Sequence, residues 1–115
     1  MKKLNESYLE IKKSKFIGLL YEVESIIEVQ EIIEELKVNN KKARHIVYAY
    51  KIDGQEKNYS DKEPTGTTRG LLDILHMKNE NKKLVVVIRY FGGILLGSGP
   101  LTRTYTKVAA MLFDK

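Results

Sequence analysis

The most constraining feature of this 115-residue chain is an aliphatic run followed by a glycine-rich segment and a proline. Five consecutive residues from Leu84 to Ile88 are apolar, which is typical of a strand buried inside a sheet. Residues 92–99 contain four glycines, which let the backbone turn sharply and approach neighbouring groups closely. Pro100 suits the first position of a helix, because the amide hydrogen that proline lacks would have no partner there. The pattern predicts a central strand, a glycine loop and a final helix over residues 100–113.

Basic residues flank the expected start of that final helix. The free backbone amides of a helix start favour anions, and Arg89, Arg103 and Lys107 add positive charge nearby. The segment lacks both the Gly-Lys-Ser/Thr of a P-loop and the G-x-G-x-x-G fingerprint, so neither kind of nucleotide site is expected. Either the loop binds a phosphate or a nucleic-acid backbone, or its glycines only permit tight packing of strand against helix. In the first case the contacting loop residues are Gly92, Gly93, Gly97, Ser98 and Gly99.

Two further strands can be placed by residue type. Residues 14–23 and 44–52 are rich in aliphatic and aromatic side chains, as buried strands are. Asp53-Gly54 is a strong signal for a hairpin turn, which predicts a return strand near residues 57–59. Residues 1–13 are polar and rich in lysine, and we expect either a short edge strand or a loosely ordered leader there.

Helical spacing appears in two further segments. Apolar residues recur at helical intervals over residues 26–36, and Ser25 with Glu28 forms a capping box at the start of this helix. Residues 68–77 predict a second, shorter helix with its leucines on one face. Strands and helices alternate only partly along the chain. We therefore expect one α+β domain over residues 1–115, a mixed sheet of about four to five strands with helices packed on one face.

Composition excludes several classes of site. The chain has no cysteine, which removes disulfides, thiolate nucleophiles and thiolate metal sites. Its apolar runs are far shorter than the roughly 20 residues that span a bilayer, and its N-terminus lacks a signal-peptide core. We expect a cytoplasmic protein with no membrane partner. The net charge of +5 permits nucleic-acid or acidic-protein partners without demanding either.

The polar loop between the return strand and the second helix carries candidate chemistry. Asp61 and Glu63 stand close to two threonine hydroxyls, but the number of ligands falls short of a calcium site, so no metal is expected. The same groups suit capping of the following helix and fixing an irregular loop. His45 starts a strand and is a phosphate or base contact, a general base, or a structural hydrogen-bonding group. The candidate loop residues are Ser60, Asp61, Glu63, Pro64, Thr65, Gly66 and Thr67.

Several separated motifs carry a family signature that runs from Ser14 through nearly all of the remaining chain. The motifs are Ala43-Arg44-His45, Tyr48-Ala49-Tyr50, Ser60-Asp61, Glu63-Pro64-Thr65-Gly66-Thr67, Arg89-Tyr90-Phe91-Gly92-Gly93, Gly97, Gly99, Leu101, Arg103 and Tyr105. Together they resemble the Impact/YigZ family. The order of the motifs makes the resemblance more specific than any one of them alone.

The resemblance implies both a fold and a biological role. The fold would be like the βαβ domain of the fourth domain of elongation factor G. The named eukaryotic member regulates translation by interfering with activation of an amino-acid-starvation kinase, and bacterial members are usually proposed to bind nucleic acid or ribosomes. No established reaction or cofactor attaches to the family, so none is expected here. Bacterial members tend to carry a second domain after the final helix, which this chain, ending at Lys115, is expected to lack.

The sequence departs from the family pattern at four places, one of which is Thr67-Thr68-Arg69-Gly70, a shortened form of the usual Thr-Ala-Gly-Lys/Arg-Pro. The segment from Ser60 to Pro64 is one residue shorter than the usual Ser-Asp-Asp-Gly-Glu-Pro. Leu95 stands where a lysine is common, and Pro100 stands where a glycine is.

The leading hypothesis is a binding module that acts in translation or on RNA. Its cleft would be formed by Arg44, His45, the loop 60–67 and the segment 89–103, with phosphate contacts dominating the affinity. Two alternatives stay open, a hydrolase that uses His45 with Asp61 or Glu63, and a regulator of translation that binds a protein partner. The oligomeric state is not predicted. Tyrosines that either stack on bases or belong to the core are Tyr48, Tyr50, Tyr59, Tyr90 and Tyr105.

Overall fold

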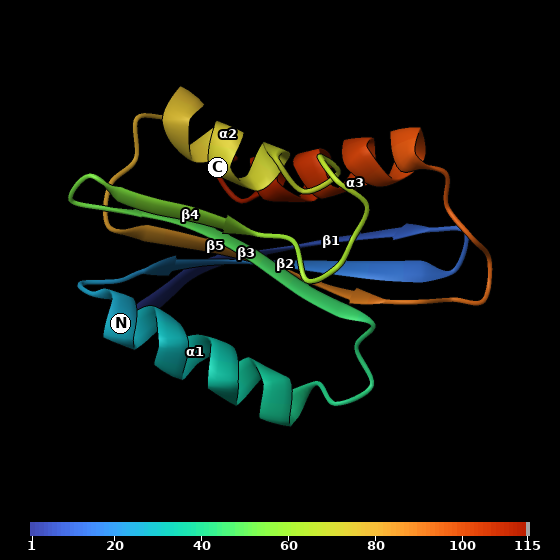
Figure 1. Cartoon of the computed structure of the whole chain (residues 1–115), viewed down its shortest axis with the longest axis horizontal. Coiled ribbons are helices and arrows are strands. Elements are labelled where there is room, and N and C mark those ends of the chain that lie inside the picture. The colour runs from blue at the N-terminus through green and yellow to red at the C-terminus, as the bar shows by residue number, and fades with distance from the viewer. Residues whose placement is uncertain (115) are drawn as a thin grey trace.

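A computed structural model describes residues 1–114 as one five-stranded sheet and three helices (Figure 1). The strand order is β1-β2-β5-β3-β4, and every neighbouring pair is antiparallel. The strands are β1 (Lys2–Ile11), β2 (Ser14–Glu22), β3 (His45–Ile52), β4 (Gln55–Tyr59) and β5 (Lys83–Tyr90). The helices are α1 (Ile26–Asn39), α2 (Gly70–Met77) and α3 (Ser98–Met111). The α+β class and the upper strand number are confirmed, but the prediction of a mixed sheet was wrong.

The helices cover both faces of the sheet. Figure 1 shows α1 below the sheet and α2 and α3 above it. Val29, Ile32 and Ile33 of α1 belong to one apolar cluster, which also contains Leu84, Val86 and Ile88 of β5. A second cluster joins α2 and α3 to the opposite face of the same strand, through Val85 and Val87. The prediction of helices on one face was wrong, because β5 presents aliphatic side chains in both directions and both faces must be covered.

Most element boundaries follow from local signals. The Ser25 side chain accepts the amide of Glu28 at 3.3 Å, and the Glu28 carboxylate accepts the amide of Glu24 at 2.6 Å. The helix cap is therefore confirmed, although the carboxylate binds one residue earlier than in an ideal capping box. Asp53 and Gly54 have φ angles of 48° and 86°, which the tight β3–β4 turn requires.

The two ends of the chain differ from the expectation in detail. β1 runs the full length of the edge beside β2, so the edge-strand alternative for residues 1–13 is the one observed. α3 begins at Ser98, which makes Pro100 its third residue rather than its first. Proline is tolerated throughout a first turn, because amides there have no partner within the helix. Within residues 1–114, no helix is both long enough and apolar enough to cross a membrane.

Candidate functional site

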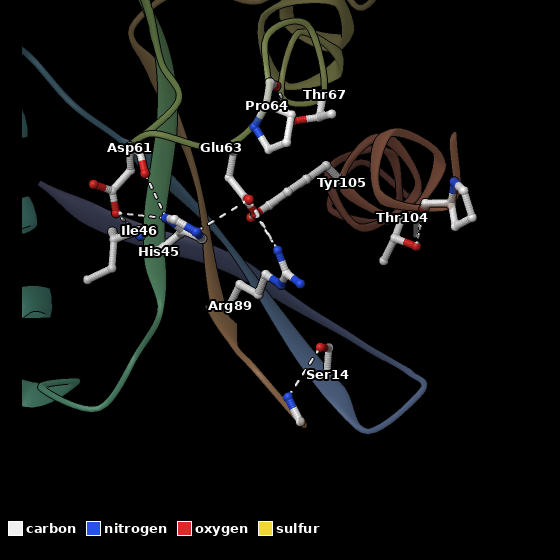
Figure 2. A network of polar contacts seen from close by, with 12 residues as sticks. Ser14, His45, Ile46, Asp61, Glu63, Pro64, Thr67, Arg89, Thr104 and Tyr105 are labelled. Carbon is white, nitrogen blue, oxygen red and sulfur yellow. Dashed lines mark hydrogen bonds and ion pairs between the residues drawn. The ribbon is translucent and has the colours of Figure 1, made fainter. Parts of the chain in front are cut away.

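A buried polar cluster forms where β3 begins and β5 ends. The strand register places His45 opposite Arg89, and the loop 60–67 returns over them from the end of β4. Figure 2 shows the Glu63 carboxylate lying between His45, Arg89 and Tyr105. Nη1 of Arg89 donates to both oxygens of Glu63 at 2.9 and 3.1 Å, and the Tyr105 hydroxyl from α3 donates to one of them. Three separate elements are therefore tied to one carboxylate.

His45 fastens the same loop to the start of β3. Its Nδ1 lies 2.6 Å from the carbonyl oxygen of Asp61, and because a carbonyl only accepts, Nδ1 carries the hydrogen. Its Nε2 lies 3.3 Å from Oε1 of Glu63. The Asp61 carboxylate accepts the backbone amide of Ile46 at 2.8 Å. Both carboxylates thus fix the irregular loop, as expected, but they bind β3 and β5 rather than the start of α2, where no side-chain cap is observed.

The ion pair at the centre of this polar cluster is buried, so it holds the fold together rather than meeting a ligand from solvent. The side chains of Glu63 and Arg89 are only 2% and 7% exposed, so the ion pair is almost fully removed from water. Burial, followed by the hydrogen bond to the Glu63 carboxylate, raises the pKa of Tyr105 far above its usual value and keeps the phenol protonated as a donor. Arg89 therefore differs from the expectation of a free cation beside the glycine loop, because its charge is already paired with Glu63.

The structure brings together His45, Asp61 and Glu63, the residues expected for a hydrolase, but these residues contact one another. Nδ1 of His45 faces the Asp61 carbonyl and Nε2 faces Glu63. A general base needs a ring nitrogen within reach of a reactant's proton, and both nitrogens are engaged here. Among the described residues, no group of three or more His, Cys, Asp or Glu side chains is arranged to hold a metal ion.

The rest of the loop 60–67 is held by its own backbone. The Ser60 carbonyl accepts the amide of Glu63 at 2.9 Å. The Pro64 carbonyl accepts both the amide and the hydroxyl of Thr67, at 3.1 and 2.7 Å. Thr65 and Gly66 form the exposed tip, where Gly66 has a φ of 86°. The loop therefore exposes Lys62, Pro64, Thr65 and Gly66 to the solvent, whereas the Glu63 carboxylate is directed into the protein.

The glycines of the segment 92–99 divide into two kinds. A Cβ on Gly92 would lie 2.1 Å from the carbonyl of Lys13, and the Gly92 amide donates to Ser14 Oγ at 3.3 Å, so this glycine packs against the β1–β2 turn. A Cβ on Gly93 would meet nothing within 4 Å, and one on Gly97 would first meet Pro100 at 3.7 Å. Gly92 therefore supports the packing interpretation. The other three glycines and Ser98 are exposed around the start of α3.

Basic side chains gather at this end of the sheet, which we call the cationic end. The β1–β2 turn, the α1–β3 connection and the β5–α3 segment lie together toward the right of Figure 1. The guanidinium carbon of Arg44 lies 4.5 Å from the centre of the Phe91 ring, and Arg103 is exposed on the first turns of α3. The exposed basic residues of the cationic end are Lys12, Lys13, Lys15, Lys41, Lys42, Arg44, Lys62 and Arg103.

The opposite end of the sheet carries mixed charges. Lys82 pairs with Glu24 at 3.2 Å, and Lys83 pairs with Glu80 at 3.5 Å. At the cationic end, by contrast, no ion pair engages the eight basic side chains within the part of the chain that the structure describes. Positive charge is thus both concentrated and unpaired on one side of the molecule.

One expected site residue, Lys107, lies away from the cationic end, and two residues of the cationic end, Lys12 and Lys13, were not predicted from the sequence. Lys107 lies further along α3 and lines a hollow of about 380 Å³ with Leu9 and Arg103. Lys12 and Lys13 were not among the predicted site residues, because a two-lysine turn has none of the usual turn residues. Their φ angles of 47° and 67° are ones that glycine or asparagine adopts more readily. Paired lysines at element boundaries were the only available signal.

Comparisons with known proteins agree with this fold and its motifs. Residues 12–113 match the model of the Impact N-terminal domain. The chain is 39% identical over 111 residues to IMPACT family member YvyE of Bacillus subtilis, covering 93% of this chain and 51% of that protein. It is 41% identical over 93 residues to Protein IMPACT-B of Xenopus tropicalis, covering 75% of this chain and 29% of that protein.

A solved structure shares the fold of this chain. The crystal structure of a hypothetical protein superposes with a TM-score of 0.88 at 29% identity, over 97% of this chain and 60% of that one. The chain spans about half the length of the bacterial relative, so what the whole relative does is not carried over with the family. The match over residues 12–113 shows that this chain belongs to the Impact family, through its N-terminal domain.

Proposed function

We propose that this chain is a translation-associated module that binds RNA, free or within ribosomal particles, through the cationic end. The observation that carries the proposal is the concentration of unpaired basic side chains around the glycine segment and the start of α3. RNA phosphates are the anions that such a surface fits, because several cations in an extended arrangement match a repeating charge. Contacts with phosphates would supply most of the affinity, and they would give little preference for a particular RNA sequence.

The geometry adds two features to the charge. The backbone amides of Ser98 and Gly99 lie at the start of α3, next to exposed glycines over which a phosphate backbone can pass closely. The Arg44 guanidinium packs over Phe91, an arrangement that holds the cation in place while leaving its edge in solvent. Membership of the Impact family supports the link to translation, because the sequence resemblance to that family implies a role in regulating translation.

Binding is expected to weaken steeply with salt. Labelled single-stranded RNA and ribosomal particles should each bind at about 50 mM salt, and the affinity should fall roughly tenfold or more by about 200 mM if three or more phosphates are contacted. Fluorescence anisotropy follows the RNA, and co-sedimentation follows the ribosomal particles. Association that tolerates salt, or that requires a protein and ignores RNA, would instead favour a protein partner, for which the exposed Leu95 is available.

A further inference from the structure

The β3–β4 hairpin carries an aromatic and cationic surface outside the cationic end. Tyr48 of β3 faces Tyr59 of β4 in the strand register, with ring centres 5.2 Å apart and planes inclined by 36°. Nζ of Lys57 lies 6.0 and 5.8 Å from the centres of these two rings. Tyr59 is 37% exposed and Tyr48 is half-buried, so both rings meet solvent.

This part of the sheet is left uncovered by α1. Residues paired across two antiparallel strands point to the same face, so Tyr59 and Lys57 share the face of Tyr48 and Tyr50. Tyr50 is packed in the apolar cluster between α1 and the sheet, whereas the side chains of β4 on this face are exposed. β4 is the edge of the sheet, beyond the reach of the helix. The hairpin therefore presents aromatic side chains on an open surface.

Contacts with neighbouring residues hold the Tyr48 and Tyr59 rings in place, and lysines lie near them. The Tyr59 hydroxyl donates to the Asp61 carboxylate at 3.3 Å, which limits rotation of the ring. Tyr48 is also stacked on Tyr50, with planes 12° apart. A hollow of about 220 Å³ continues from Asp61 toward α1, and Lys37 and Lys41 line it. Because Lys41 belongs to the cationic end, the aromatic surface continues the proposed binding surface.

We propose that Tyr48 and Tyr59 form a stacking platform for unpaired bases of a single-stranded RNA, with Lys57 and Lys41 on the flanking phosphates. This inference rests on the proposed RNA-binding function. A base stacks on an aromatic ring with little sequence preference, whereas bases within a duplex are already stacked on one another. Lys57 has an exposed, flexible stem, so its ammonium can move from the ring faces to a phosphate when a base arrives. The platform gives the chain a preference for single strands that phosphate contacts alone do not supply.

The test compares two forms of RNA and four forms of the protein. Labelled oligouridylate and a duplex of the same length are titrated against the wild type, Tyr59→Leu, Tyr59→Phe and Tyr8→Leu. Leucine keeps an apolar side chain but removes the π-face, so we expect the single strand to bind about five- to a hundredfold more weakly and the duplex within about twofold. Phenylalanine should retain single-strand binding. Tyr8, which is 48% exposed on the opposite edge strand, is the matched control and should change neither affinity.

The outcomes separate this inference from the function on which it rests. If the wild type binds neither RNA form, the RNA-binding function itself fails. If the wild type binds both forms in a salt-dependent way and Tyr59→Leu binds the single strand as tightly as the wild type does, only the platform is overturned. Self-association of the wild type that Tyr59→Leu abolishes, measured by sedimentation, would assign the surface to a second copy and also overturn the platform.

Discussion

Replacing Glu63 by glutamine is expected to lower the free energy of unfolding by about 3–5 kcal/mol. The substitution keeps the size of the side chain but leaves the Arg89 guanidinium, only 7% exposed, without its counter-charge. Nε of Arg89 already has no hydrogen-bond partner among the described residues, so the neighbourhood offers little compensation. The hydrogen bond from Tyr105 would also change from a charged acceptor to a neutral one. Urea denaturation followed by circular dichroism measures the difference.

Two controls separate the buried pair from general effects of losing a carboxylate. Glu34→Gln removes an exposed pair with Lys37, whose side chains are 74% and 53% exposed, and should change stability by less than about 1 kcal/mol. The double variant Glu63→Gln, Arg89→Met should recover much of the loss, because no unpaired charge is then buried. A Glu63→Gln variant within about 1 kcal/mol of the wild type would show that Glu63 does not hold this region together.

Neutralising three residues of the cationic end is expected to weaken binding of single-stranded RNA by about tenfold or more at low salt. The variant Lys12→Gln, Lys13→Gln, Arg44→Gln removes charge from the two connections that flank the glycine segment. If each residue neutralises one phosphate, the slope of log affinity against log salt should become shallower by about 2. Anisotropy titrations at several salt concentrations give both quantities.

The matched control variant has the same net charge as this triple variant, but its three substitutions lie at the opposite end of the sheet. Lys78→Gln, Lys82→Gln, Lys83→Gln removes three positive charges near the α2–β5 connection, two of which are already in ion pairs. This variant should keep most of its affinity and its salt slope. Equal losses in the two triple variants would mean that net charge alone attracts RNA, with no defined surface.

Local signals in the sequence account for most of the fold. Ser25 and Asp53-Gly54 marked a helix start and a hairpin, because caps and tight turns depend on a few adjacent residues. The run from Leu84 to Ile88 correctly indicated a central strand. The same run also indicates which faces of the sheet must be covered. Five consecutive aliphatic residues alternate between the two faces of a sheet, so they imply helices on both faces rather than one.

The candidate site depended on contacts that no local pattern specifies. Glu63 and Arg89 are 26 residues apart, and nothing in either segment indicates that their charges meet inside the protein. Arg89 therefore read as a free cation, although it is one of the most buried polar residues. The β1–β2 turn at Lys12 and Lys13 lacks the residues that mark turns, so its position beside Gly92 could not be inferred. Arg44, Arg103 and the exposed glycines remain candidates because the structure leaves them accessible.

Mapping RNA onto the folded protein by NMR tests the central claim most directly. A single-stranded RNA oligonucleotide is titrated into the isotope-labelled chain, and backbone amide shifts are followed residue by residue. We expect the largest changes at residues 12–15, 41–45 and 92–99, around the cationic end, and little change at residues 78–83. Saturating shifts centred on residues 78–83, or no shifts at an RNA concentration that binds by anisotropy, would contradict RNA binding at the cationic end.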